Sequence, residues 1–181
     1  GVEVHVVRSH VTTPAVRVGA MSALLVLCAV LTWQRSTLWG DQPRMAALWA
    51  ARSPASSRAQ ATASSFDIDA GRPDTALSRL LPLWEQRPND LQLALNAASA
   101  YCAKGELPDD VSRRIAAALR GATEGDMLVH RWLDRALTLV DAGTCRGLTD
   151  ATVQAFLDAA SQNPRLRAMR VEILDKAAKI S

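Results

Sequence analysis

The stretch from Arg58 to Asp90, RAQATASSFDIDAGRPDTALSRLLPLWEQRPND, decides the fold. It predicts two helices joined by a tight turn. Gly71 closes the first helix, because glycine adopts a left-handed C-terminal cap at little cost. Pro73 opens the second helix, since proline is tolerated in a first helical turn, and Pro88 ends it. The second helix has an apolar stripe at helical spacing that consists of Leu77, Leu80, Leu81 and Trp84.

The same pattern recurs along the chain. Pro54 and Pro88 are 34 positions apart, and so are Gly71 and Gly105. The same shift aligns apolar residues with apolar residues: Trp49 with Leu83, Ala46 with Leu80, Ala63 with Ala97 and Ala61 with Leu95. A period of about 34 residues is typical of stacked helix–turn–helix repeats. We therefore expect an all-α chain whose larger part, residues 42–180, is a solenoid of helical hairpins.

The repeated unit resembles the tetratricopeptide family. The family's glycine, small, bulky and proline positions are occupied by Gly71, Ala76, Leu80 and Pro88. In the next unit, Ala98, Tyr101 and Gly105 occupy the small, aromatic and glycine positions. In the third, Thr149 is the expected N-cap, and Phe156, Ala159 and Pro164 occupy the closing positions.

The chain also departs from the family pattern. Gln60 and Asp67 stand where the family prefers tryptophan and tyrosine, and Leu83 replaces a small residue. Pro82 falls inside a helix, which it is expected to bend or whose start it is expected to shift. In the third unit, the helix near Met127–Ala142 is followed by GTCRGL, a longer connection than the family allows. Arg165–Ile180 is predicted to be a terminal capping helix.

The resemblance implies a concave groove for a protein or peptide partner. Six residues are expected to line it: Arg58, Ser65, Asp69, Gln92, Ser99 and Cys102. An ordinary solvated face is the alternative. The clamp with which some relatives hold a C-terminal carboxylate is not reproduced, because Ala61 and Ser65 stand at two of its positions and only Asn96 fits.

An uncharged run between Arg17 and Arg35, VGAMSALLVLCAVLTWQ, precedes the repeats. About 17–25 apolar residues are needed to cross a bilayer as a helix. We therefore expect residues 16–39 to form a transmembrane helix with an interfacial anchor, following an extended or disordered segment at 1–15. No small-x-small cleavage site follows the run, which argues against a signal peptide. A buried core helix stays open as an alternative.

The sequence predicts no cofactor, metal site or catalytic centre. A net charge of +3, without a basic cluster, argues against nucleic acid. His5 and His10 have no third ligand nearby, and His130 and Asp134, four residues apart, are interpreted as a surface pair. Asp67 and Asp69 point in different directions on a helix. A disulfide between Cys102 and Cys145 is conceivable in an oxidising compartment, but two unrelated small apolar residues are the favoured interpretation.

These observations predict a membrane-anchored protein-interaction module rather than an enzyme. The expected location is a bacterial inner membrane with the repeats on the periplasmic side. The alternative is the C-terminal accessory domain of a polytopic glycosyltransferase whose catalytic part lies upstream of Gly1. It depends on a resemblance of the junction to bacterial membrane proteins related to protein O-mannosyltransferases. The residues of that resemblance are Trp33, Gln34, Arg35, Leu38, Trp39, Leu48, Trp49, Ser53 and Pro54.

Overall fold

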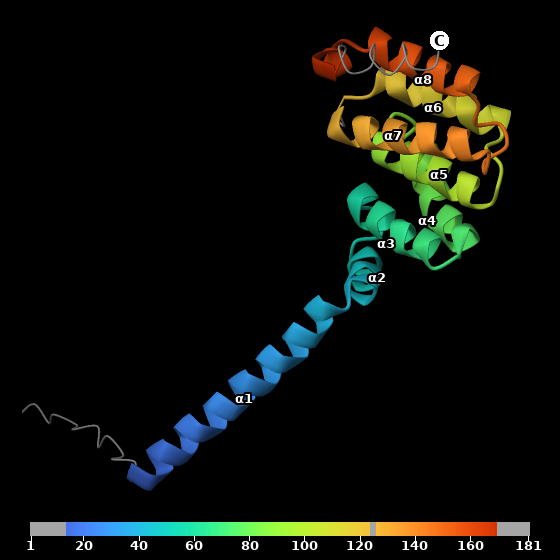
Figure 1. Ribbon diagram of the computed structural model, residues 1–181. Coiled ribbons are helices and arrows are strands. Elements are labelled where there is room, and N and C mark those ends of the chain that lie inside the picture. The colour runs from blue at the N-terminus through green and yellow to red at the C-terminus, as the bar shows by residue number, and fades with distance from the viewer. Residues whose placement is uncertain (1–13, 124–125, 170–181) are drawn as a thin grey trace, which may run out of the picture. The chain divides into compact units, whose positions relative to one another are not determined.

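A computed structural model describes residues 14–123 and 126–169, and nearly all of them lie in helices (Figure 1). The helices are α1 (Pro14–Gly40), α2 (Gln42–Arg52), α3 (Ser57–Asp69), α4 (Pro73–Gln86), α5 (Leu91–Ala103), α6 (Asp109–Gly121), α7 (Asp126–Ala142), α8 (Asp150–Gln162) and the 3-10 helix η1 (Pro164–Met169). These described residues contain no strand, and their one β-bridge joins Glu106 to Arg146. The predicted all-helical fold is confirmed.

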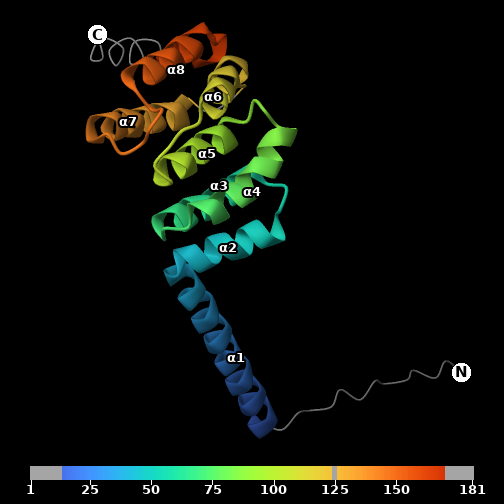
Figure 2. The same ribbon diagram turned by 90° about the vertical axis from the view of Figure 1, so that its right-hand side faces the viewer.

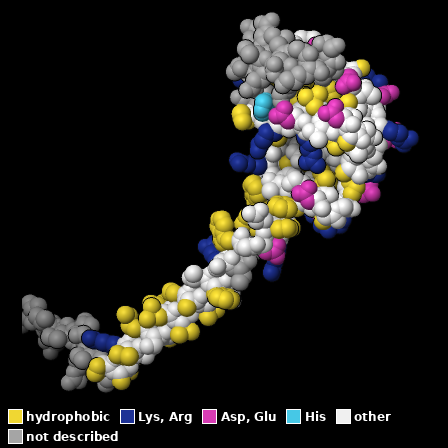
Figure 3. Space-filling model, in the orientation of Figure 1, with side chains coloured by type: hydrophobic (Ala, Val, Ile, Leu, Met, Phe, Trp, Pro, Cys, Tyr) yellow, Lys and Arg dark blue, Asp and Glu magenta, His cyan; other side chains and the backbone are white. Residues whose placement is uncertain are grey.

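The chain divides into two compact units, Gly1–Met45 and Ala46–Ser181. The first contains α1, which begins at Pro14, slightly before the expected start of the anchor. Its stretch Pro14–Ser36 is long and apolar enough to cross a membrane by length and composition. Its large apolar side chains are exposed, Leu25 at 66%, and Figure 3 shows them along the helix in yellow. The segment expected at 1–15 lies outside the described residues except for Pro14 and Ala15, which are helical.

The second unit, which we call the helical domain, begins with the predicted hairpins. Ser56 caps α3 with its side-chain oxygen, which accepts the Ala59 N–H at 3.3 Å. Gly71 then has a φ of 71° and Gly105, after α5, a φ of 93°. Both glycines therefore take the left-handed conformation that the sequence predicts for them. Pro73 is the first residue of α4, as expected.

The helix α4 continues through Pro82 to Gln86, so this proline neither ends the helix nor shifts its start. A proline removes the hydrogen bond to the carbonyl four residues earlier, here that of Ser78. Both Pro82 and Ser78 are exposed, so water can replace the missing donor. The expected apolar stripe lies inside, with Leu77, Leu80 and Trp84 buried and Leu81 half-buried.

The domain has one main core. Its largest buried side chains include Leu80, Trp84, Leu93, Ile115 and Phe156. Of the residues expected to define the repeat, the buried ones are Ala76, Ala98, Phe156 and Ala159. Tyr101 is half-buried, Pro88 is exposed between α4 and α5, and Pro164 begins η1. The small side chains of Ala76 and Ala98 allow neighbouring helices to pack closely.

Two of the departures from the family pattern are buried polar residues with several partners. The Gln60 amide donates to the carbonyl oxygens of Ala50 at 2.9 Å and Pro54 at 3.3 Å, which fastens α2 and its loop to α3. Asp67 accepts from Arg72 at 2.8 Å and from Arg79 at 2.9 Å. Asp69, by contrast, is exposed. The expected divergence of the two aspartates is confirmed.

Helix packing changes along the domain. The helix α3 packs on α4 and α5, and α4 packs on α5. Figures 1 and 2 show α5 between α3 and α7. At the C-terminal end, α6 packs on α8, while α7 packs on α5 and α8. Of the expected capping helix Arg165–Ile180, the residues up to Met169 lie in the 3-10 helix η1. Asn163 Oδ1 accepts the Arg165 N–H at 2.9 Å, which favours this tighter turn. Residues 170–180 lie outside the described part.

Candidate functional site

The loop GTCRGL, longer than the family allows, pairs with the loop between α5 and α6. Leu107 N–H donates to the Arg146 carbonyl at 2.7 Å, and Arg146 N–H donates to the Gly105 carbonyl at 2.9 Å. An exposed ion pair of 2.7 Å joins Arg146 to Glu106. We call this pair of loops the loop seam. The loop seam therefore joins segments about 40 residues apart in the sequence.

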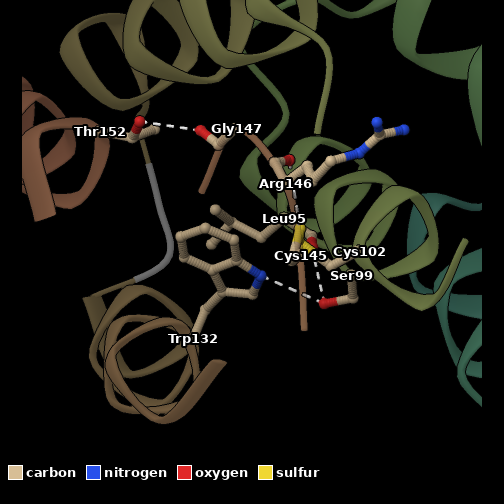
Figure 4. Close-up of a disulfide and its surroundings, with 8 residues drawn as sticks. All are labelled: Leu95, Ser99, Cys102, Trp132, Cys145, Arg146, Gly147 and Thr152. Carbon is tan, nitrogen blue, oxygen red and sulfur yellow. Dashed lines mark hydrogen bonds between the residues drawn. A yellow bond between two sulfur atoms is a disulfide. The ribbon is translucent and has the colours of Figure 1, made fainter. Parts of the chain in front are cut away.

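A disulfide between Cys102 and Cys145 fastens the loop seam to the end of α5. Figure 4 shows the bridge beside Ser99 and Trp132. The Trp132 indole donates to Ser99 Oγ at 3.1 Å and packs edge-on against Phe156 at 5.7 Å between ring centroids. The favoured interpretation of two unrelated cysteines is therefore wrong. Spacing alone could not reveal the pair, because the sulfur atoms meet only through the loop seam.

A cleft of about 600 Å³ is lined by the first turns of α3 and α5 and by α7. Its lining consists of Ser57, Arg58, Asn89, Asp90, Leu91, Gln92, Thr123, Leu128 and Arg131. We call it the basic cleft, because two arginines line it and its one carboxylate is already engaged. Asp90 caps α5 by accepting the Leu93 N–H at 3.2 Å. Figure 3 shows Lys and Arg side chains on this face of the domain, in dark blue.

The two arginines of the basic cleft are available to a ligand. Arg58 in the first turn of α3 and Arg131 on α7 are exposed. Within residues 14–123 and 126–169, neither makes an ion pair. A third arginine near the cleft, Arg87, donates to Ser57 Oγ at 3.0 Å. The cleft therefore combines two guanidinium groups with the polar Gln92 and Asn89, a set that suits carboxylate groups.

The loop between α4 and α5 is held in place by close packing. A Cβ atom on Gly121, at the end of α6, would lie 2.9 Å from the side-chain Cγ of Asn89. Glycine thus lets α6 approach the wall of the basic cleft. Behind the cleft, the Arg114 guanidinium lies 4.1 Å from the centre of the Trp84 ring. The Trp84 indole donates to the Pro88 carbonyl at 3.2 Å, which holds the residue that precedes Asn89.

A second cleft, of about 410 Å³, lies at the other end of α5. Its lining consists of Ser99, Cys102, Ala103, Lys104, Gly105, Arg135, Leu139 and Thr144. Lys104 donates to Asp74 at 2.6 Å, and this hydrogen bond, together with the carboxylate's charge, raises the pKa of the lysine. Ser99 and Cys102 are committed to Trp132 and to the disulfide. This cleft is therefore partly occupied by interactions of the fold itself.

The six residues expected to line one groove are thus divided. Arg58 and Gln92 lie in the basic cleft, and Ser99 and Cys102 lie in the second cleft. Ser65 is half-buried, with its hydroxyl donating to the Thr62 carbonyl at 2.8 Å, and it lies outside both, as does the exposed Asp69.

Sequence reasoning missed Arg131. Arg58 and Gln92 are 34 positions apart and hold equivalent places, but Arg131 follows Gln92 by 39. The repeat period therefore does not point to it. The sequence signal that remains for Arg131 is its position on the polar side of α7, opposite the buried Val129 and Leu133.

His130 Nε2 lies 3.4 Å from Asp134 Oδ2 on α7, the expected surface pair. His5 and His10 lie outside the described residues. In the described part, no three His, Cys, Asp or Glu side chains are grouped so as to hold a metal ion. No protein-family model matches this chain, and no match was found among curated proteins or among solved structures.

Proposed function

We propose that this chain is a membrane-anchored protein-interaction module. In this proposal, α1 crosses a bilayer, and the basic cleft binds a carboxylate-bearing segment of a partner protein. The observation that carries it is the placement of Arg58 and Arg131, two exposed guanidinium groups from different helices, in one cleft of about 600 Å³. The side chains of the cleft are suited to bind carboxylates and contain no adjacent nucleophile and base, so binding is favoured over catalysis.

The architecture supports the same proposal. In its support, α3 packs on α4 and α5, and α4 packs on α5. We infer that α3–α8 form a short tetratricopeptide-like solenoid with η1 near its end. Such arrays stabilise each hairpin through its neighbours and leave one face open to a partner.

The disulfide supports a particular compartment for the helical domain. Structural disulfides persist in oxidising compartments and are rare in the cytosol. The Cys102–Cys145 bridge therefore supports a helical domain on the non-cytoplasmic side, in a bacterium the periplasm. On that side, α1 would tether the helical domain to the membrane, within reach of other envelope proteins.

The proposal is tested by peptide binding to the full chain in lipid nanodiscs. Fluorescein-labelled peptides rich in Asp and Glu, and matched peptides rich in Lys and Arg, are titrated by fluorescence anisotropy. We expect the acidic peptides to bind more tightly. The double variant Arg58→Gln/Arg131→Gln should weaken that binding by about tenfold, which corresponds to about 1.4 kcal/mol.

A matched control separates the cleft from the overall charge. Arg113→Gln/Arg120→Gln removes the same two charges from exposed positions on α6, outside both clefts. It should leave the affinity nearly unchanged. An equal loss in both double variants would show that the peptides respond to net charge alone, and the cleft would lose its assigned role.

A further inference from the structure

The helix α2 has an exposed apolar surface that the packing of the helical domain leaves uncovered. We propose that this surface lies in the phospholipid headgroup layer and holds the start of the domain against the membrane. The inference rests on the proposed function in one respect: it requires that α1 crosses the bilayer.

The chain itself limits how far α2 can be from the bilayer. The apolar stretch ends at Ser36, and α1 continues for four residues to Gly40. At 1.5 Å per residue these add about 6 Å. Asp41 is the single residue between α1 and α2 and adds about 4 Å. The polar layer on each side of the hydrocarbon core is about 5–8 Å thick. With α1 in a membrane, α2 therefore begins in or beside the headgroup layer.

The two sides of α2 have different surroundings. Ala46 and Ala50 are buried and pack with Ala63 and Phe66 of α3. Leu48 and Trp49, by contrast, are each 40% exposed. Leaving two adjacent large apolar side chains in water on a helix of 11 residues forfeits their burial energy. Contact with lipid would recover that energy.

The order of residues along α2 matches an interfacial helix. Met45, Leu48, Trp49 and Arg52 follow the spacing i, i+3, i+4, i+7, so they lie along one side. Tryptophan is enriched at the lipid–water boundary, where its ring contacts the lipid and its N–H remains solvated. Arginine can extend its guanidinium group to lipid phosphates. In the described part of the chain, neither Arg44 nor Arg52 makes an ion pair, so both are available for phosphate contacts.

The choice of lipid over a protein as the occupant follows from the tether. A protein partner would have to fit between α2 and the bilayer, where the short connection to α1 leaves little room. The headgroup layer is present there whenever α1 is inserted. Its phosphates complement the two arginines, and its boundary with the acyl chains suits Leu48 and Trp49.

The test uses the environment-sensitive dye NBD on the full chain in vesicles of phosphatidylcholine and phosphatidylglycerol. The background is Cys28→Ser, which removes the exposed thiol. Single sites are made by Leu48→Cys on α2, Leu25→Cys in the apolar stretch and Met127→Cys on α7. Met127 is a matched control, because it is a large apolar side chain that is also exposed. Lipids that carry a nitroxide near the headgroup, or deep in the acyl chain, serve as quenchers.

We expect NBD at position 48 to lose most of its fluorescence to the shallow nitroxide, and NBD at position 127 to lose little. NBD at position 25 should be quenched by the deep nitroxide. If position 25 is quenched and position 48 is not, the inference about α2 is overturned while the membrane span stands. Equal quenching at 48 and 127 also overturns it. If position 25 is not quenched, the proposed anchor fails, and the inference fails with it.

Discussion

At the scale of single residues, glycines in the left-handed conformation differ in what surrounds them. A Cβ atom on Gly71 would meet no atom within 4 Å, whereas one on Gly147 would lie 2.2 Å from the Leu107 carbonyl oxygen. We therefore expect Gly71→Ala to lower the free energy of unfolding by about 1 kcal/mol, the cost of the left-handed backbone. Gly147→Ala should cost clearly more, because the loop seam must also move apart.

Urea denaturation followed by circular dichroism measures both changes. Gly71→Asn is the control, since asparagine tolerates the left-handed conformation better than alanine. It should recover part of the stability that Gly71→Ala loses. Equal stability of Gly71→Ala and the unchanged chain would show that the φ of this turn has been misassigned.

Asn163 is a buried residue whose role could not be read from the sequence. Its side-chain amide donates to the carbonyls of Leu119 at 2.8 Å and Ala122 at 2.9 Å, more than 40 residues away. An unsatisfied buried polar group costs about 1–3 kcal/mol. We expect Asn163→Ala to cost about 2 kcal/mol, because both carbonyls would lose their donor.

The control for Asn163 is Asn96→Ala. The Asn96 amide donates only to the Gln92 carbonyl, one turn earlier in the same helix, at 2.7 Å. Alanine also has the higher helix propensity. Thermal unfolding should therefore show a much smaller effect, or a gain. If both variants lose the same stability, the link between α6 and the end of α8 contributes nothing measurable.

At the scale of elements, the loop seam and its disulfide join two segments that belong to different predicted hairpins. Cys102 and Cys145 are separated by 43 positions. Closing a loop of that length is expected to stabilise the folded state by about 2–4 kcal/mol. Reduction with dithiothreitol should lower the urea midpoint of the helical domain by an amount consistent with this value.

The double variant Cys102→Ala/Cys145→Ala should show the same lowered midpoint with and without reductant. Cys28→Ser should remain sensitive to reductant, because Cys28 is not part of the bridge. A midpoint of the unchanged chain that does not respond to reductant would show that the bridge does not stabilise the domain.

The elements that could be predicted are those fixed by local signals. Gly71 and Pro73 define the turn between α3 and α4, and Thr149 caps α8 by accepting the Thr152 N–H at 3.3 Å. Such signals involve only residues a few positions apart, so they can be recognised without knowing how the rest of the chain folds. The loop seam and the Asn163 contacts depend on segments about 40 residues apart, and no local pattern encodes them.

The candidate site divides in the same way. Arg58 and Gln92 were expected from the family resemblance to line a groove, and both line the basic cleft. Arg131 was not, because the repeat period is lost between α5 and α7. Cys102 was predicted to face a partner, but it is buried in a disulfide. The side of the helix on which a residue lies therefore indicates its role less well than the contacts of its side chain do.

At the scale of the whole molecule, the proposed anchor makes the last prediction. Leu25 lies within the apolar stretch and is 66% exposed. An arginine at the centre of a membrane helix costs about 2.5–3.5 kcal/mol on an insertion scale. The uncharged run within the stretch, residues 18–34, has 17 residues and therefore little apolar length to spare. Leu25→Arg should therefore move the protein from the membrane fraction to the alkaline-soluble fraction.

Leu48→Arg is the matched control, because it places the same charge on an exposed leucine of α2, outside the apolar stretch. It should remain in the membrane fraction, since α1 alone retains it. Circular dichroism of the solubilised Leu25→Arg chain should still report a folded helical domain, because Leu25 lies in the other compact unit. If Leu25→Arg instead unfolds the helical domain, α1 is a core helix of a soluble protein. Retention of Leu25→Arg through alkaline extraction would likewise contradict a transmembrane α1, because the arginine would have incurred no insertion cost.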